Sequence, residues 1–155
     1  MKYRMLTQEE MVIFDDDFKH FLIVNGVHNE EWIEMNASDI DKATRLVELF
    51  SDTVLQKVYE KIQFLEFRSS NSCMVFKFKA DTIELISLNV KKQNTIDLST
   101  PESIHASLTG SPKALTLFKS QKSYTENREL EIHTMLEQGC MNSSEEFWIS
   151  LEKIL

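Results

Sequence analysis

The sequence predicts an α+β protein that is mostly helical and has one antiparallel β-hairpin packed on helices. Three observations predict this class. Apolar residues recur mainly at three- and four-residue steps, the stretch 73–79 alternates apolar and polar side chains, and each glycine and proline stands where a helix would begin or end. Residues 64–68 can either end a long helix or add a third strand that completes a meander, and we favour the helix.

The first expected helix, residues 7–25, begins at a capping box in which Thr7 and Glu10 each bond the other's backbone N–H. A second helix is expected at 29–36. The third, at 39–65, carries a continuous apolar line and should form the spine of the core. That line consists of Ile40, Ala43, Val47, Phe50, Val54, Val58 and Ile62.

The strands of the hairpin come next. In "CMVFKFK", residues 73–79, Met74, Phe76 and Phe78 lie on one side and the lysines on the other. The stretch "TIELISLNV", residues 82–90, follows as the second strand. Because an isolated hairpin is marginal in water, this one must pack on helices or pair with another sheet edge, in this chain or in a second copy.

The remaining helices are expected at 101–109, 112–120, 123–138 and 144–154. Pro101 and Pro112 suit the first helical position, where no backbone donor is lost. Gly26, Gly110 and Gly139 each follow an amphipathic stretch, where helices commonly end. Because all three glycines are used in this way, no glycine-rich loop remains to hold a phosphate, which excludes P-loop and dinucleotide-binding sites.

The length of 155 residues fits one domain. We expect residues 1–92 to hold the N-terminal helices and the hairpin, and residues 98–155 to form a C-terminal helical part that packs with the first as one unit. The polar stretch 91–100 is the expected linker between them.

Charge and composition exclude two kinds of partner. The net charge is −8, and residues 1–66 carry 7 basic and 14 acidic side chains. Because no basic stripe is available to neutralise phosphates, we expect no nucleic-acid partner. No apolar run reaches the roughly 18–20 residues that span a bilayer, so we expect no membrane partner.

The chain start and the cysteines indicate a cytoplasmic protein. The opening "MKYRMLTQEE" turns acidic before any apolar run, unlike a secretory signal. Cys73 and Cys140 lie far apart and in no CxxC pair, so we expect free thiols.

Two sets of acidic and histidine residues are the weak candidates for metal ligands. Glu9, Asp16 and His20 lie along one face of the helix expected at 7–25. Glu129, His133 and Glu137 lie along one face of the helix expected at 123–138. A single helix face supplies such ligands only where other segments complete the shell, and runs of charge are usually solvated. We therefore expect solvated faces, no metal site and no cofactor, and we assign no catalytic residue.

Apolar residues away from the main helix stripes are the candidates for an interface. Val12 and Ile23 lie on the side of the first helix that faces away from its phenylalanines. Trp32 and Trp148 could serve as anchors either in the core or in an interface, since such rings dominate both. These residues favour a protein partner or a homodimer.

Several short stretches resemble a family of small bacterial proteins of unknown function. They are "MKYRMLTQEE" at 1–10, "FSD" at 50–52, "LEFRS" at 65–69, "IELISL" at 83–88 and "LEQGC" at 136–140. The resemblance runs through most of the chain and implies a bacterial, intracellular protein. It carries over no functional residues.

The function is unknown at this level, and the sequence favours a non-catalytic protein–protein interaction or adaptor module. Enzymatic activity is left open. One alternative is a metal-dependent enzyme that uses the acidic and histidine helix faces. The other is an acidic nucleic-acid mimic, which draws on the excess negative charge of residues 1–66.

Overall fold

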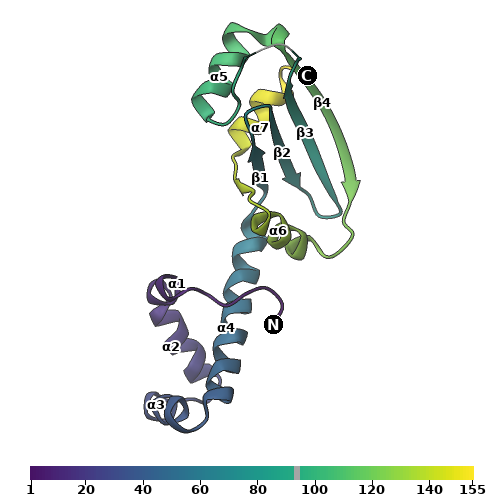
Figure 1. The fold of residues 1–155 in the computed structure, drawn as a ribbon. Coiled ribbons are helices and arrows are strands. Elements are labelled where there is room, and N and C mark those ends of the chain that lie inside the picture. Colours follow the sequence, from purple (N-terminus) through teal and green to yellow (C-terminus); the bar gives the residue numbers. More distant parts are fainter. Residues whose placement is uncertain (93–94) are drawn as a thin grey trace. The chain divides into compact units, whose positions relative to one another are not determined.

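The computed structural model describes residues 1–92 and 95–155 (Figure 1). Contacts divide the chain into two compact units, Met1–Tyr59 and Glu60–Leu155. We call them the helical unit and the sheet unit. Residues 93–94 of the expected linker lie outside the described residues. No helix within the described ranges is both long enough and apolar enough to cross a membrane.

The helical unit is built from four helices. They are α1 (Gln8–Ile13), α2 (Asp15–Val24), α3 (Asn29–Ser38) and α4 (Ile40–Lys61), whose last two residues belong to the sheet unit. The capping box at the start of α1 is confirmed, because Glu10 N–H donates to Thr7 Oγ1 at 3.2 Å and Thr7 N–H donates to Glu10 Oε1 at 2.8 Å. The single helix expected at 7–25 is wrong, since the backbone of Phe14 leaves the helical conformation and separates α1 from α2.

Aromatic rings fill the core of the helical unit. The ring of Phe18 lies 5.0 Å from that of Phe50 and 5.2 Å from that of Trp32, centre to centre. The apolar line predicted for α4 reaches this cluster through Phe50. Its members near the two ends of the helix, Ile40 and Val58, are 65% and 41% exposed.

The sheet unit contains a five-stranded antiparallel sheet in the order β4-β3-β2-β1-β5. Its strands are β1 (Phe64–Arg68), β2 (Ser72–Phe78), β3 (Thr82–Val90), β4 (Leu115–Ser123) and β5 (Met141–Asn142). The α+β class and the β2–β3 hairpin are therefore confirmed. The helix favoured for residues 64–68 is wrong, because these residues pair with β2 and complete the meander that the sequence left open.

The helix expected at 112–120 is also wrong. Pro112–Ala114 form only one 3₁₀ turn, and the chain then enters β4 and pairs with the whole of β3. The remaining helices are α5 (Pro101–Gly110), α6 (Arg128–Glu137) and α7 (Glu145–Glu152). Strands β4 and β5 thus come from the expected C-terminal part and join the same sheet as the hairpin.

One face of the sheet carries the main core of this unit. Figure 1 shows α5 and α7 beside this sheet. The buried members are Phe64, Cys73, Val75, Ile86, Leu88, Leu98, Ile104, Leu115, Trp148 and Leu151. Residues of β3 are buried on both faces, since Ile86 and Leu88 belong to this core and Ile83 on the opposite face is 1% exposed.

Candidate functional site

Strand β1 places two opposite charges beneath the helices of the sheet unit. Glu66 and Arg68 are two residues apart and therefore point to the same face. Their partners in β2 are Val75 and Cys73, both members of the buried core. The charged pair thus stands on the apolar face of the sheet, at the edge of its core.

A pocket of about 240 Å³ opens above this pair. We call it the α5–α7 pocket, because those two helices supply its walls. Its lining residues are Glu66, Arg68, Pro101, Ile104, His105, Leu108, Ser144, Phe147 and Ser150.

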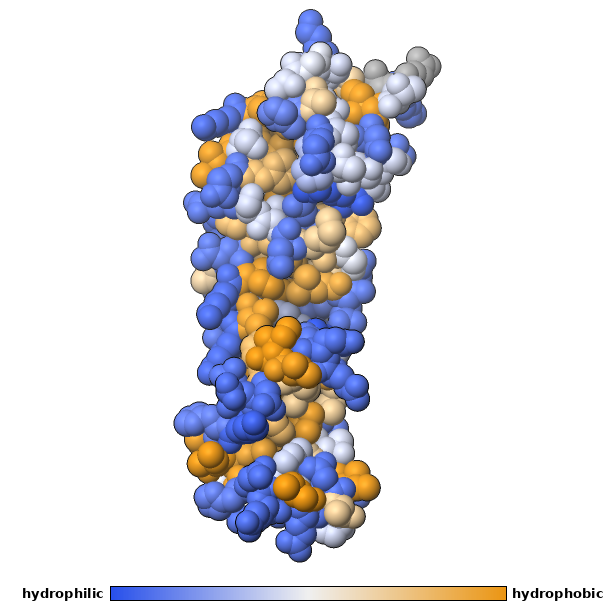
Figure 2. Space-filling view, turned by 90° about the vertical axis from the view of Figure 1, so that its left-hand side faces the viewer, coloured by the Kyte–Doolittle hydropathy of each residue, from blue (hydrophilic) through white to orange (hydrophobic). Residues whose placement is uncertain are grey.

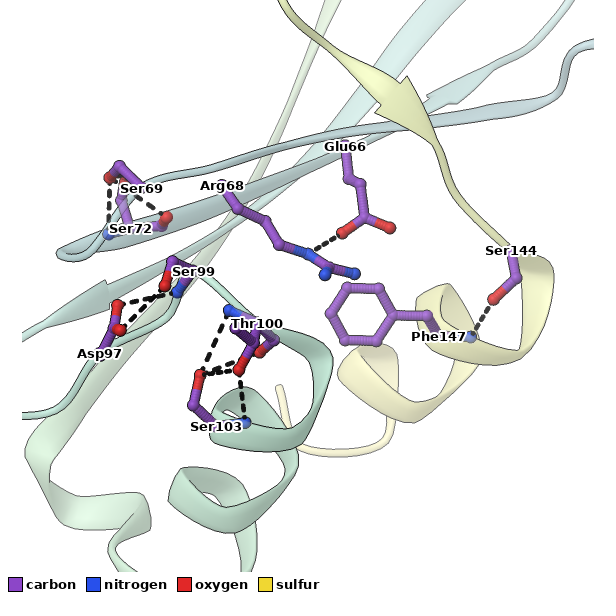
Figure 3. A network of polar contacts seen from close by, with 10 residues as sticks. All are labelled: Glu66, Arg68, Ser69, Ser72, Asp97, Ser99, Thr100, Ser103, Ser144 and Phe147. Carbon is purple, nitrogen blue, oxygen red and sulfur yellow. Dashed lines mark hydrogen bonds and ion pairs between the residues drawn. The ribbon is translucent and has the colours of Figure 1, made fainter.

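The ion pair forms the charged part of the lining (Figure 3). Nε of Arg68 donates a hydrogen bond to Oε2 of Glu66, and the two side chains are only 12% and 6% exposed. The guanidinium carbon of Arg68 lies 6.0 Å from the centre of the Phe147 ring, within cation–π range. The guanidinium is therefore oriented from two sides, by a carboxylate and by an aromatic face.

Local hydrogen bonds hold the start of α5, which forms one wall of the pocket. The Ser103 N–H donates to Thr100 Oγ1 at 3.1 Å, and Pro101 occupies the first turn as predicted. Just before the helix, the fully buried Leu98 donates its N–H to Ser70 O at 3.0 Å. The start of α5 is thereby fastened to the turn between β1 and β2.

A side-chain cap positions the wall formed by α7. Phe147 N–H donates to Ser144 Oγ at 3.2 Å, so Ser144 is the N-cap. Because Phe147 lies in the first turn of α7, this cap also fixes the ring that faces Arg68.

The pocket offers both hydrogen-bond donors and an acceptor. Among the described residues, the hydrogen bonds leave Nη1 and Nη2 of Arg68 and Oε1 of Glu66 without an oxygen or nitrogen partner. Ile104, Leu108 and Phe147 make the rest of the lining apolar. A concave, mainly apolar surface with a few placed polar groups is typical of small-ligand sites.

The groups near the pocket suit binding better than nucleophilic catalysis. Burial raises the pKa of the Cys73 thiol to about 11, with the Glu66 carboxylate adding to the rise and Arg68 opposing it. The hydroxyl of Ser144 accepts the cap bond, and that of Ser150 donates to Phe147 O at 2.7 Å. A thiol with a raised pKa supplies little thiolate and is therefore a poor nucleophile.

The helical unit has a cavity of its own, about 340 Å³ in volume, between α2 and α3. We call it the α2–α3 groove. It is lined by Asp15, Phe18, Lys19, Leu22, Ile23, Val27, Asn29 and Trp32. Its charged members, Asp15 and Lys19, form an ion pair at 2.9 Å, and the other lining residues are mostly apolar.

Some of the predicted interface residues are exposed or line the α2–α3 groove, and one is buried in a core. Val12 is 77% and Ile23 57% exposed, and Ile23 and Trp32 both line the α2–α3 groove. Trp148 is 1% exposed and belongs to the core of the sheet unit. Of the two roles expected for it, in the core or in an interface, it has the role in the core. Apolar patches, coloured orange among blue charged side chains, are visible on the face drawn in Figure 2.

The candidate metal ligands are not brought together. Glu9 lies on α1, whereas Asp16 and His20 lie on α2, so the break at Phe14 removes the shared helix on which their alignment depended. Glu129, His133 and Glu137 do share α6. Within residues 1–92 and 95–155, no group of three His, Cys, Asp or Glu side chains is arranged to hold a metal ion.

Sequence reasoning missed Glu66 and Arg68 as site residues. Assigned to a helix, they fall on different sides, about 200° apart. As a strand, "FLEFR" places both charges on one face, and that signal would have indicated an ion pair.

Comparison with known proteins gives a family but no activity. Residues 1–155 match the model of a family described as "Family of unknown function (DUF6495)", and the chain belongs to that family. The resemblance to a family of unknown function is therefore confirmed. No curated protein and no solved structure matches the chain.

Proposed function

We propose that this member of a family without an assigned activity is a non-catalytic interaction module, whose α2–α3 groove docks an apolar side chain from a basic segment of a partner protein. The observation that carries the proposal is the groove itself. It combines an aromatic ring, Trp32, with the exposed Ile23 on helices that are otherwise strongly acidic.

Apolar exposure supports docking at this place. Val24, the neighbour of Ile23 at the end of α2, is 71% exposed. Single exposed apolar residues are ordinary, but groups of them beside an apolar hollow are typical of interaction sites. A tryptophan that lines such a hollow is a common energetic anchor.

Charge supports a basic partner. Residues 15–38, which contain α2 and α3, carry six carboxylates and one lysine, and that lysine is paired with Asp15 at 2.9 Å. A partner with Lys or Arg around its apolar residues would be attracted to this surface. Residues 1–59 carry 12 acidic and 6 basic side chains, so the same segment of a second copy would be repelled by this surface. This repulsion disfavours a homodimer through the groove.

The two alternatives from the sequence remain hypotheses. A nucleic-acid mimic needs carboxylates spaced like phosphates, whereas this groove is lined mostly by apolar side chains. A metal-dependent enzyme needs ligands that converge. The apolar groove therefore favours the interaction module, and a cytoplasmic location is part of the same proposal.

The test uses the full chain with Trp148→Phe, which leaves Trp32 as the only tryptophan. The probe is an amphipathic leucine–lysine helical peptide, and a scrambled peptide of the same composition is its control. We expect the amphipathic peptide to shift the Trp32 emission to shorter wavelength in a saturable, salt-sensitive manner. The scrambled peptide should bind at least about tenfold more weakly, because it cannot present one apolar face.

Two matched variants locate the site. Ile23→Asp should lower the affinity by at least about tenfold, whereas Ile40→Asp, at a residue that is also exposed but lies outside the groove lining, should leave it unchanged. Equal binding of both peptides, or full binding by Ile23→Asp, would overturn the proposal. So would a stable dimer in light scattering that Ile23→Asp dissociates, because the occupant would then be a second copy.

A further inference from the structure

We infer that the α5–α7 pocket is a separate binding site for a small uncharged ligand that carries a hydrogen-bond donor and an acceptor on one carbon atom, as a primary carboxamide does, joined to a compact apolar group. This inference goes beyond the proposed docking function and uses none of its residues. It rests on the polar atoms, the charge and the walls of the pocket.

The Glu66–Arg68 pair presents polar atoms to the pocket. Both side chains are nearly buried, yet their mutual bond uses only Nε and Oε2. Among the described residues the fully buried polar atoms without a partner are Ser143 Oγ and Trp148 Nε1, whereas Nη1, Nη2 and Oε1 are not fully buried, so water in the pocket can reach these three atoms. A ligand that replaces this water must supply hydrogen bonds to the same atoms.

Glu66 and Arg68 are in contact and together carry no net charge. A charged ligand would lose its hydration on entering and would meet an ion pair that is already neutral, so its desolvation would not be repaid. An uncharged polar group avoids this cost and is favoured over a carboxylate or an amine.

The free oxygen of Glu66 only accepts hydrogen bonds, and the Nη groups of Arg68 only donate them. The complementary ligand edge has an N–H directed at Glu66 and an oxygen directed at Arg68. A primary carboxamide has both on one carbon atom, whereas an ester lacks the donor.

Ile104, Leu108 and Phe147 face the pocket, and its volume of about 240 Å³ lies below the roughly 300–1,000 Å³ of sites for drug-sized ligands. The apolar part of the ligand is therefore compact. A single ring can pack beside Phe147.

The experiment titrates the ¹⁵N-labelled full chain with four probes that share one ring and differ in the attached group: benzamide, benzoate, benzylamine and methyl benzoate. Benzamide should move the amide resonances of β1 and of the first turn of α7 in a saturable manner. The other three should bind at least about tenfold more weakly, since each either carries a charge or lacks the donor.

Glu66→Gln provides the sharper test. This variant removes the negative charge and leaves Arg68 uncompensated, so the preference should turn from benzamide to benzoate. A preference for benzamide that is unaltered in a folded Glu66→Gln chain would overturn the inference. So would equal affinity for all four probes in the natural chain.

A second pair of variants does not disturb the ion pair. Leu108→Trp should fill the pocket and abolish benzamide binding, whereas Ile149→Trp, at an exposed position of α7 outside the pocket lining, should retain it. Retained binding in Leu108→Trp would place the ligand elsewhere and overturn the inference. Ile23→Asp should bind benzamide normally, so failure of the docking proposal and failure of this one are distinguishable.

Discussion

The carboxylate of Asp52 on α4 accepts a hydrogen bond from the backbone N–H of Tyr3 at 2.8 Å. The same carboxylate also accepts the Lys2 N–H at 2.6 Å, and the Leu6 N–H donates to Ser51 Oγ at 3.1 Å. Two neighbouring side chains of α4 thus hold the N-terminal segment, which has no helix or strand of its own before α1.

Removing the carboxylate should therefore release this segment. Asp52→Ala should lower the free energy of unfolding by about 1.5–3 kcal/mol, because two backbone donors lose a charged acceptor. Asp52→Asn keeps one oxygen acceptor and should cost less. Lys57→Ala, an exposed change on the same helix, is the control and should stay within about 0.5 kcal/mol. Urea unfolding followed by circular dichroism measures all three, and an Asp52→Ala midpoint equal to that of the control would contradict the role of Asp52.

Gly139 and Gly110 should respond in opposite ways to alanine. Gly139 has φ +105°, which L-residues rarely adopt, and its added Cβ would meet only an ordinary contact, 3.5 Å from Phe67 Cε2. The cost of Gly139→Ala, about 1–3 kcal/mol, should therefore come from the backbone.

Gly110 provides the matched comparison. It is the last residue of α5, has no left-handed φ, and offers open space for a Cβ. Gly110→Ala should be neutral or should stabilise the protein by up to about 1 kcal/mol. Thermal unfolding of both variants decides the matter, and equal stabilities would mean that residue 139 relaxes to an ordinary backbone conformation.

The features that could be predicted from the sequence are those with local causes. The Thr7–Glu10 box needs only residues three apart, and the left-handed Gly26 and Gly139 follow α2 and α6 as expected. Alternation in β2 is equally local, because it follows from the pleat of a single strand. These signals do not depend on what the segment later contacts.

Strands β1 and β4 could not be predicted in this way because their cause is distant pairing. Most side chains of β4 are exposed, so it lacks the alternation of a half-buried strand, and its order comes from backbone bonding to β3. Pro112 suggested a helix start and did start one, but the helix is a single 3₁₀ turn. Apolar patterns in a sequence indicate which side chains are buried, and few side chains of this edge strand are buried.

The α5–α7 pocket was beyond sequence reasoning for a related reason. Its polar pair lies on β1, whereas its walls come from segments some 35 and 80 residues further along the chain. Only the tertiary packing brings Phe147 to Arg68. The candidate metal ligands Glu9, Asp16 and His20 failed for the opposite reason. Their alignment depended on one unbroken helix, and the helix is interrupted at Phe14.

The capping box of α1 should make the free energy of unfolding depend on pH under acidic conditions. The hydrogen bond from Arg4 is the largest cause that lowers the pKa of Glu10, from 4.5 to about 2, and the bond from the Thr7 backbone adds to it. A pKa that is lower in the folded state stabilises the protein above the unfolded value. This contribution should be complete above pH 4.5 and should disappear as the pH falls toward about 2.

Glu10→Gln tests this directly. The variant should be less stable than the natural chain near neutral pH, and the difference should shrink as the pH falls below 4.5. In an Arg4→Met background the difference should already be smaller at neutral pH, because the largest cause of the pKa shift is missing. A difference that stays constant across the acid range would mean that Glu10 titrates alike in the folded and unfolded chain.

The two thiols should report separately on the packing of the sheet unit. Cys73 is fully buried and its pKa is raised to about 11, so the native chain presents neither access nor thiolate to a reagent. Cys140 is only partly buried, although burial raises its pKa too. An aromatic disulfide reagent should therefore label Cys140 first at mildly alkaline pH.

Single-cysteine variants turn this order into a measurement of opening. With Cys140→Ser, the labelling of Cys73 should be slow in buffer and should accelerate steeply with urea, because it requires the separation of β2 from the helices that cover it. With Cys73→Ser, the labelling of Cys140 should depend much less on urea. If Cys73 reacted as fast as Cys140 in native buffer, the core face beside Glu66 and Arg68 would be open to solvent, and the Glu66–Arg68 pair would no longer be the desolvated group that selects a neutral ligand.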